Sequence, residues 1–219
     1  MGRPSLWIAL ICVGQFFIAN KTSSLELSSL FTDYMVLQRD QPVPVWGWDE
    51  PGTEVTVTFS GQKVKALADE DGAWRATLQP LKLNKQPQEL IVTVGEKQLV
   101  RNGILVGDVW LCGGQSNMEM TFQAPRLPCD LPNFVKPGDY PMIRHLKVHP
   151  VRTKNFTQEQ LEQPQARLHP DQVKQGWQTC DEETYKGFTA TGFFFAYTLA
   201  NEVDVPIGLL NITQGNTRI

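Results

Sequence analysis

The sequence predicts a mixed α/β protein in which a β-sandwich-like region, residues 25–103, precedes the first part of an α/β region, residues 104–219. Three observations support this fold class. Short segments that alternate polar and apolar residues fill the first region, with turn residues at roughly the eight- to twelve-residue spacing of β-sandwiches. A nearly continuous apolar run, Ile104–Cys112, opens the second region and is typical of a strand covered on both faces. A strand, a helix and another strand then follow in order, which indicates a βαβ unit with a parallel sheet.

Residues 1–24 have the features of a secretory signal peptide. A short positively charged start, Met1–Arg3, precedes the apolar stretch Leu6–Ala19 and a group of small and polar residues. The apolar stretch is shorter than the ~20 residues of a membrane-spanning helix, so an uncleaved membrane anchor is the second alternative. We expect an exported protein, secreted, periplasmic or lysosomal depending on the organism, with no stable membrane insertion after signal removal.

Five segments of residues 25–103 have the alternation of half-buried strands. They are Val43–Trp48, Glu54–Phe59, Lys63–Ala68, Trp74–Leu78 and Glu89–Val94. Turn-forming clusters such as Asp49–Gly52 separate them, and no stretch shows helical periodicity of useful length. Three tryptophans, Trp46, Trp48 and Trp74, are expected to fill the core or the contact between the two regions. Stacking of these rings on sugars is the alternative.

Three strands and one helix are predicted in residues 104–219. The strands are Ile104–Cys112, Met142–Val148 and Ile207–Ile212, and the helix is Thr191–Val203. The helix is expected to form its apolar face from Phe194, Tyr197 and Leu199 or Ala200. Residues 150–188 are polar and irregular, with a short helix expected at Gln158–Glu162. Because doubly wound sheets usually contain about five strands, we expect the α/β region to be incomplete.

A serine follows two glycines at the end of the first of these strands, in the segment Gly113–Met118. Glycine allows a tight turn, and the Ser116 hydroxyl then stands at the carboxyl end of the strand, where open α/β sheets bind their ligands. The backbone N–H groups after the turn can face an oxyanion. This pattern indicates a strand-turn-helix nucleophile elbow, although the sequence is not G-x-S-x-G. A capping box with Glu119 is a compatible alternative, Asn117 is expected to support the loop, and Asp108 to hold neighbouring backbone.

The composition excludes several classes of function. The formal net charge is −3, and no cluster of lysine and arginine indicates a nucleic-acid partner. No cysteine or histidine spacing indicates a metal site, and no cofactor is implied. The three histidines, His145, His149 and His169, are expected to be sheet or surface residues, and none is assigned as a catalytic base.

Three cysteines remain after the signal peptide. Cys112 is expected to be a small buried apolar residue, whereas Cys129 and Cys180 lie in loop-like sequence, where a disulfide between them is one alternative. N-glycosylation motifs, which matter only in a eukaryotic source, begin at Asn20, Asn155 and Asn211. The last of these asparagines is expected near the end of a buried strand.

Four segments resemble the sialate O-acetylesterase family, a branch of the SGNH-type carbohydrate esterases. They are Phe31–Arg39, Val45–Gly47, Gly107–Met118 and Pro206–Asn211. The resemblance runs from about Ser28 to Ile219. It implies a flavodoxin-like α/β/α hydrolase domain that begins in residues 104–219, with a β-domain, residues 25–103, attached to it. It also implies removal of O-acetyl groups from sialic acid or related sugars by a serine mechanism.

In this resemblance Ser116 matches the nucleophile, and its backbone N–H matches one oxyanion donor. Gly215 falls where the family has its second oxyanion donor. The chain departs from the family at Gln214, where a tryptophan is common, and at Asn216, where a second glycine is common. The sequence contains neither the later asparagine block of the family nor its Asp-x-x-His pair, so these residues are expected to lie outside this chain.

Three functions remain open from the sequence. The first is a carbohydrate O-acetylesterase of which residues 1–219 lack the base, so that this chain alone has little or no esterase activity. The second is a catalytically inactive sugar-binding paralogue, and the third is an acetylxylan-type esterase with the same serine chemistry. In the enzymatic cases the expected partner is an acetylated carbohydrate.

Overall fold

The computed structural model describes residues 25–124, 136–149 and 173–214, and its class is mixed α/β, as the sequence predicts. The strands are β1 (Glu26–Leu27), β2 (Val36–Gln38), β3 (Val43–Trp48), β4 (Glu54–Phe59), β5 (Gln62–Leu67), β6 (Ala73–Leu78), β7 (Asn84–Val94), β8 (Lys97–Gly114), β9 (Ile143–Lys147), β10 (Gln178–Thr179) and β11 (Ile207–Thr213). The helical elements are α1 (Ser116–Glu119), the 3-10 turns η1 (Pro137–Asp139) and η4 (Thr184–Gly187), and α3 (Ala190–Glu202).

Several predicted features lie outside the described residues. They are the signal peptide 1–24, the short helix Gln158–Glu162, and the residues Asn20, Cys129, Asn155, His169 and Gly215. Among the helices that the structure describes, none is long and apolar enough to cross a membrane.

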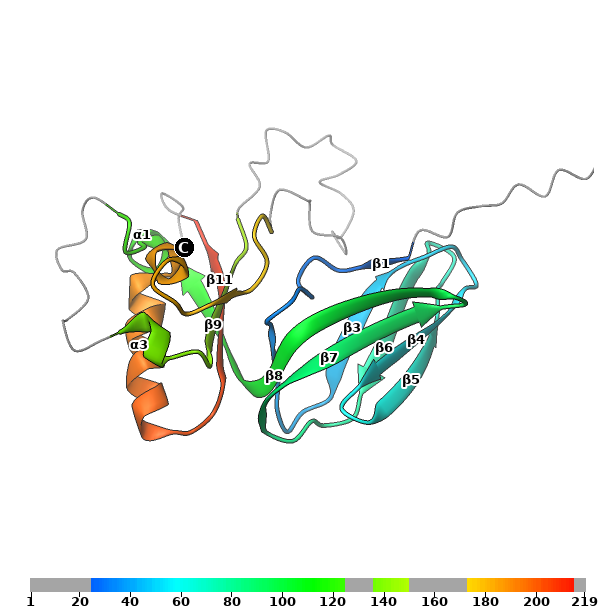
Figure 1. Cartoon of the computed structure of the whole chain (residues 1–219). Coiled ribbons are helices and arrows are strands. Elements are labelled where there is room, and N and C mark those ends of the chain that lie inside the picture. The colour runs from blue at the N-terminus through cyan, green and yellow to red at the C-terminus, as the bar shows by residue number, and fades with distance from the viewer. Residues whose placement is uncertain (1–24, 125–135, 150–172, 215–219) are drawn as a thin grey trace, which may run out of the picture.

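The strands form two sheets. β1, β3 and β6 make an antiparallel sheet of three strands. The larger sheet has eight strands, in the order β10-β9-β11-β8-β7-β4-β5, with β2 also paired to β8. Within it β9, β11 and β8 run parallel, whereas neighbours among β8, β7, β4 and β5 run antiparallel. Figure 1 shows the antiparallel strands on the right and the parallel strands with α3 on the left.

Alternation along the strands places apolar side chains between the two sheets of the β-rich half. Val45 of β3 and Val57 of β4 come from different sheets, and both are fully buried in one common core. Trp48 and Trp74 are buried, as expected, and Trp46 is half-buried at the edge of the same core. Burial of such side chains is worth about 1.5–3 kcal/mol each, so this core is a main source of stability for residues 25–103.

β8 runs without interruption through the predicted boundary between residues 103 and 104. Its first part pairs with β7 and its last seven residues pair with β11. The pairing with β7 shifts register near Gly103. Two features require glycine there: its φ is 70°, and a Cβ at this position would lie only 2.6 Å from the Tyr34 ring. Such bulges bend a strand, so one strand can serve both halves of the molecule.

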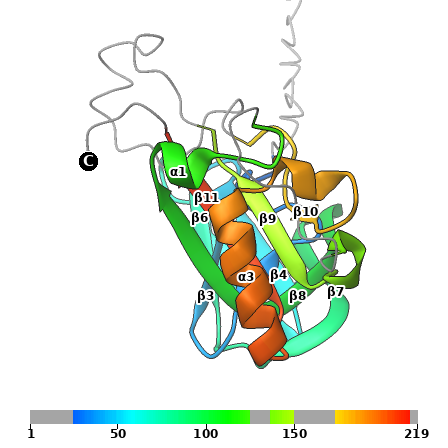
Figure 2. The same cartoon turned by 90° about the vertical axis from the view of Figure 1, so that its left-hand side faces the viewer.

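α3 precedes β11 and covers one face of the parallel strands (Figure 2). Thr189 caps its start, because the Thr189 hydroxyl accepts a hydrogen bond from the N–H of Gly192 at 3.3 Å. The chain leaves the helix before Pro206, which cannot continue a helical hydrogen-bond ladder. β11 then lies between β8 and β9, and this places its carboxyl end beside the end of β8.

The apolar face of α3 differs from the expected one by about one residue position. Phe193 and Ala196 are fully buried against the sheet. The residues predicted for this role, Phe194, Tyr197, Leu199 and Ala200, are only partly buried. A small side chain at Ala196 lets the helix approach the strands closely, so the bulky rings of the predicted face pack on its flanks against Phe122 and Tyr140.

Candidate active site

The turn after β8 depends on one of its two glycines. Gly114 has a φ of 143°, a conformation that L side chains rarely adopt, and a Cβ there would lie 3.3 Å from the Cβ of Met118. At Gly113 no atom lies within 4 Å of a built Cβ, so the structure does not require glycine at that position. The chain turns sharply at Gly114, and α1 follows after Gln115, with Ser116 as its first residue.

Ser116 is exposed at the carboxyl edge of the parallel strands. Gln115, and not Ser116, is the N-cap residue, and no side chain caps this helix, so the capping box is not formed. Within the described residues the Ser116 hydroxyl has no recorded hydrogen-bond partner, and the N–H groups of Ser116 and Asn117 make no backbone hydrogen bond. An exposed hydroxyl beside N–H donors at a helix start is an arrangement that can attack a carbonyl and stabilise the resulting oxyanion.

The serine turn is fixed against the start of α3. The hydroxyl of Thr191 donates to the backbone oxygen of Asn117 at 3.0 Å, and the N–H of Ala190 donates to the oxygen of Met120 at 2.8 Å. The Thr189 hydroxyl also contacts the Met118 sulfur at 3.5 Å. Asn117 therefore holds the loop through its carbonyl group, while its side chain is exposed.

Four polar residues form a hydrogen-bonded chain on the neighbouring strand ends. Lys147 of β9 donates to the Thr213 hydroxyl at 2.9 Å, and this hydroxyl donates to the Asn211 side-chain oxygen at 2.7 Å. The Asn211 amide lies 3.5 Å from Nε2 of His145. Sequence reasoning did not identify Lys147, Thr213 or Asn211 as site residues, because the network depends on which strands pair. Polar residues at alternate positions of two buried strands were the available signal.

His145 is a buried sheet histidine, as expected. Its ring stacks on Phe188 with centroids 4.6 Å apart. Burial, together with the nearby Lys147 charge, lowers the pKa of His145 to about 3, so the ring is neutral at physiological pH. Burial also lowers the pKa of Lys147, against the opposing effect of Glu119, and lowers the pKa of half-buried His149. No contact of these histidines with Ser116 is recorded among the described residues.

Beside this network lies a cavity of about 280 Å³. Its walls come from the ends of β9 and β10, from η4 and from the segment after α1. Its lining includes Gln123, Lys147, Gln175, Gln178, Thr184 and Phe188. Amide and ammonium groups together with an aromatic ring suit a polar ligand of the size of one sugar.

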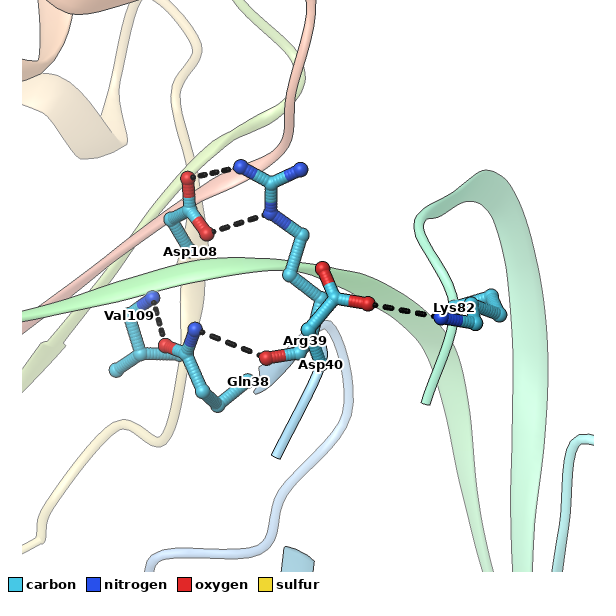
Figure 3. Close-up of polar contacts among 6 residues, drawn as sticks. All are labelled: Gln38, Arg39, Asp40, Lys82, Asp108 and Val109. Atoms are coloured by element: carbon cyan, nitrogen blue, oxygen red, sulfur yellow. Dashed lines mark hydrogen bonds and ion pairs between the residues drawn. The ribbon is translucent and has the colours of Figure 1, made fainter. Parts of the chain in front are cut away.

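β2 is joined to β8 by a polar cluster (Figure 3). Arg39 donates two hydrogen bonds to the Asp108 carboxylate, at 2.8 and 3.1 Å, and this pairing raises the pKa of Arg39. The Gln38 amide oxygen accepts from the N–H of Val109 at 2.9 Å. Asp108 was expected to hold neighbouring backbone; it instead holds the side chain that follows β2. The pairing of β2 with β8 ends at Gln38 and Gly107, and the pairing of β8 with β11 begins at the next residue, Asp108.

Neither described cysteine is reactive in this structure. Cys112 and Cys180 are free and buried, and burial raises the pKa of the Cys112 thiol and raises that of Cys180 to about 12. The possible partner Cys129 lies outside the described residues. Asn211 is 0% exposed, so its side chain is not accessible for glycosylation in the folded chain.

Known proteins similar to this chain are sialic acid and carbohydrate esterases. It is 31% identical over 208 residues to the sialate O-acetylesterase of Homo sapiens and 28% identical over 209 residues to that of Mus musculus. Each match covers 89% of this chain but only 38% and 36% of the respective relative, so the chain spans somewhat over a third of their length. No family model matches the chain.

A solved structure agrees with these relatives. The crystal structure of a carbohydrate acetylesterase from Xanthomonas citri superposes with a TM-score of 0.74 at 36% sequence identity, and the match covers 88% of this chain and 41% of that one. Sequence and structure thus lead to the same group of proteins. The chain belongs to the sialate O-acetylesterase family.

Proposed function

We propose that this chain carries the nucleophile of a carbohydrate O-acetylesterase and that Ser116 is this nucleophile. The observation that supports the assignment best is the exposed Ser116 hydroxyl directly after the Gly114 turn, at the carboxyl edge of parallel strands. The relatives are named for removal of acetyl groups from sialic acid or carbohydrate. We propose sialic acid or a related sugar as the substrate.

In the proposed reaction the Ser116 oxygen bonds to the acetyl carbon while a base removes its proton. The tetrahedral oxyanion accepts hydrogen bonds from the N–H groups of Ser116 and Gly215, and each such donor typically contributes ~3 kcal/mol. The sugar oxygen then leaves with the proton. Water attacks the acetyl-serine with help from the same base, which releases acetate and restores the hydroxyl.

The base and its carboxylate partner are proposed to come from a part of the protein that packs beside β8. Successive residues of a strand direct their backbone groups to opposite edges, so Leu111 and Gly113 direct theirs away from β11. Beyond Val109, whose N–H is bound by Gln38, no strand of the described residues pairs with this edge. Parallel sheets are normally covered, yet the side chains of Trp110 and Leu111 on β8 are 43% and 63% exposed. Both observations support a further segment packed against this part of β8.

The finer features of the fold and the destination of the protein belong to the same proposal. Residues 25–103 are proposed to form a sandwich-like β-domain and residues 104–219 to begin an SGNH-type α/β/α domain. Two facing sheets with one core in the β-rich half, and three parallel strands in the other half, are the supporting observations. Residues 1–24 are proposed to act as a signal peptide, so that the protein is exported.

Acetate release tests the substrate and the need for a further segment. The chain 1–219 is assayed on 9-O-acetylated sialic acid and on acetylated xylan oligosaccharides, alone and within the product of its own gene. We expect little or no release by the chain alone, and release from acetylated sialic acid by the gene product. Rapid release by residues 1–219 would contradict the proposed origin of the base. A preference for acetylated xylan would support the acetylxylan-type alternative.

A further inference from the structure

The cavity at the ends of β9 and β10 has a cation in its wall that the proposed chemistry does not use. Lys147 lies at the carboxyl end of β9, and β9 is separated from β8 by one strand, β11. With ~4.8 Å between neighbouring strands, the backbones of β9 and β8 are about 10 Å apart. The cavity and Ser116 therefore share one edge of the sheet.

Lys147 has unused hydrogen-bonding capacity. Its ammonium is half-buried, and its recorded hydrogen-bond partner is the neutral hydroxyl of Thr213 at 2.9 Å. An ammonium has three N–H donors, so two have no hydrogen-bond partner among the described residues and can bind a ligand. The Thr213 hydroxyl is itself fixed by its bond to buried Asn211. The hydrogen bonds from Lys147 to Thr213 and from Thr213 to Asn211 hold the Lys147 ammonium in one place beside the cavity.

The other charged groups at the cavity do not compensate Lys147 fully. His145 is neutral, and half-buried His149 is biased toward its neutral form by burial. Glu183 lines the cavity, but its side chain is 87% exposed and lies 3.7 Å from the ammonium of Lys186. Glu119 acts on Lys147 electrostatically without lining the cavity. A partly desolvated ammonium in this setting favours an anionic ligand group.

The remaining walls suit the neutral parts of a sugar. Gln123 and Gln175 offer amide donors and acceptors, and Gln178 offers its amide oxygen, because its NH₂ group donates to the backbone oxygen of Gln175 at 2.8 Å. The Thr184 hydroxyl is held by the backbone of Thr179 and Asp181 and completes the polar wall. The volume of about 280 Å³ is near the lower end of the ~300–1,000 Å³ of small-molecule sites, which fits one sugar unit and not a long oligosaccharide.

We propose that this cavity binds a carboxylate-bearing sugar unit and that Lys147 is the residue that distinguishes acidic from neutral sugars. The assignment rests on the proposed function and adds a specificity residue to it. The sugar carboxylate accepts a charge-assisted hydrogen bond from Lys147, while the acetyl ester of the same sugar lies toward Ser116. A carboxylate is absent from neutral acetylated sugars, so the same cavity would hold them less well.

Binding of two matched probes tests this assignment. N-acetylneuraminic acid and its carboxyl methyl ester differ in charge but hardly in shape, and their affinities for the folded chain are measured by calorimetry or ligand-observed NMR. We expect the acid to bind at least about tenfold more tightly, because a hydrogen bond to a charged group typically contributes this much. Lys147→Met should abolish the difference, and Lys147→Arg should retain much of it.

Lys63→Met is the matched control, because Lys63 is an exposed lysine on β5, far along the sheet order from β9. It should leave both affinities unchanged, and circular dichroism should show that all variants are folded. Equal affinities for acid and ester, or no binding of either, would overturn the assignment of the cavity. A preference for the acid that survives Lys147→Met would overturn the role of Lys147. Acetate release from 9-O-acetylated sialic acid by the gene product would still support the proposed function in each of these cases.

Discussion

Gly114 is the residue on which the geometry of the serine turn depends most. Its φ of 143° strains any other residue, and an added Cβ would lie 3.3 Å from the Cβ of Met118, a tight contact, whereas Gly113 has open space around it. We expect Gly114→Ala to lower the free energy of unfolding by about 1–3 kcal/mol and to displace Ser116.

Gly113→Ala is the control for this change. It should alter stability by less than ~0.5 kcal/mol, as is usual for exposed positions without special geometry. Urea denaturation of both variants provides the comparison. Equal loss of stability at the two positions would contradict the assignment of the turn to Gly114.

His145 makes the stability of the fold depend on pH. The unfolded histidine binds a proton below pH ~6.5, whereas the pKa of about 3 keeps the folded ring neutral, so the unfolded state takes up more protons between these values. Stability is therefore expected to fall as pH decreases from 7 to 5, by about 2 kcal/mol from this residue. Half-buried His149 acts in the same direction.

The measurement for this prediction is the urea midpoint of the wild type and of His145→Gln at both pH values. The variant should lose most of the pH dependence, because glutamine does not titrate and can still bond Asn211. An unchanged slope in the variant would contradict the role of His145.

Residue-scale prediction from sequence succeeded where one local pattern was sufficient. The exposed position of Ser116 and the buried positions of Cys112 and His145 follow from their places in or after apolar runs. Lys147 and Thr213 were missed because their contact joins residues 66 positions apart and depends on the pairing of β9 with β11.

At the scale of elements, β8 has the least predictable structure. β3 and β4 have the predicted bounds, because alternation and turn residues define both of their ends. β8 begins at Lys97, seven residues before the predicted Ile104, because β7 supplies the pairing for a polar segment that has little strand character of its own. Such tertiary pairing is not visible in a local pattern.

The open edge of β8 leads to a prediction about association. An exposed, apolar, unpaired strand is a template for pairing with another chain. We expect the isolated chain to self-associate, and we expect Leu111→Lys to reduce this by placing a charge on the edge, with little change in unfolding free energy. Size-exclusion chromatography with light scattering measures the effect.

Leu67→Lys is the matched control, since Leu67 is 66% exposed on β5 and Leu111 is 63% exposed on β8. It should leave association unchanged. If both variants reduced association equally, the β8 edge would not be the specific site of association.

For the whole molecule, the continuous strand β8 has a consequence for folding. It pairs with β7 in the β-rich half and with β11 in the parallel half. If β8 unfolded, both halves would therefore lose a strand and its hydrogen bonds. We expect a single cooperative unfolding transition in calorimetry, with far-ultraviolet circular dichroism and tryptophan fluorescence changing together. Two separated transitions would show that the halves fold as independent domains.

The mixed α/β class and the family followed from the sequence because both depend on local patterns and short motifs. The order of strands in the parallel sheet did not, because sheet order is set by long-range pairing: β11, the last strand, lies between β8 and β9. This order places the cavity and Ser116 at one edge.

The assignment of Ser116 as the nucleophile is tested most directly by acetate release from 9-O-acetylated sialic acid by the product of this protein's own gene, with and without Ser116→Ala. The account predicts release by the wild type and a loss of at least about a thousandfold in kcat for the variant, because no other group replaces a missing nucleophile. A variant that releases acetate at the wild-type rate would contradict the assignment.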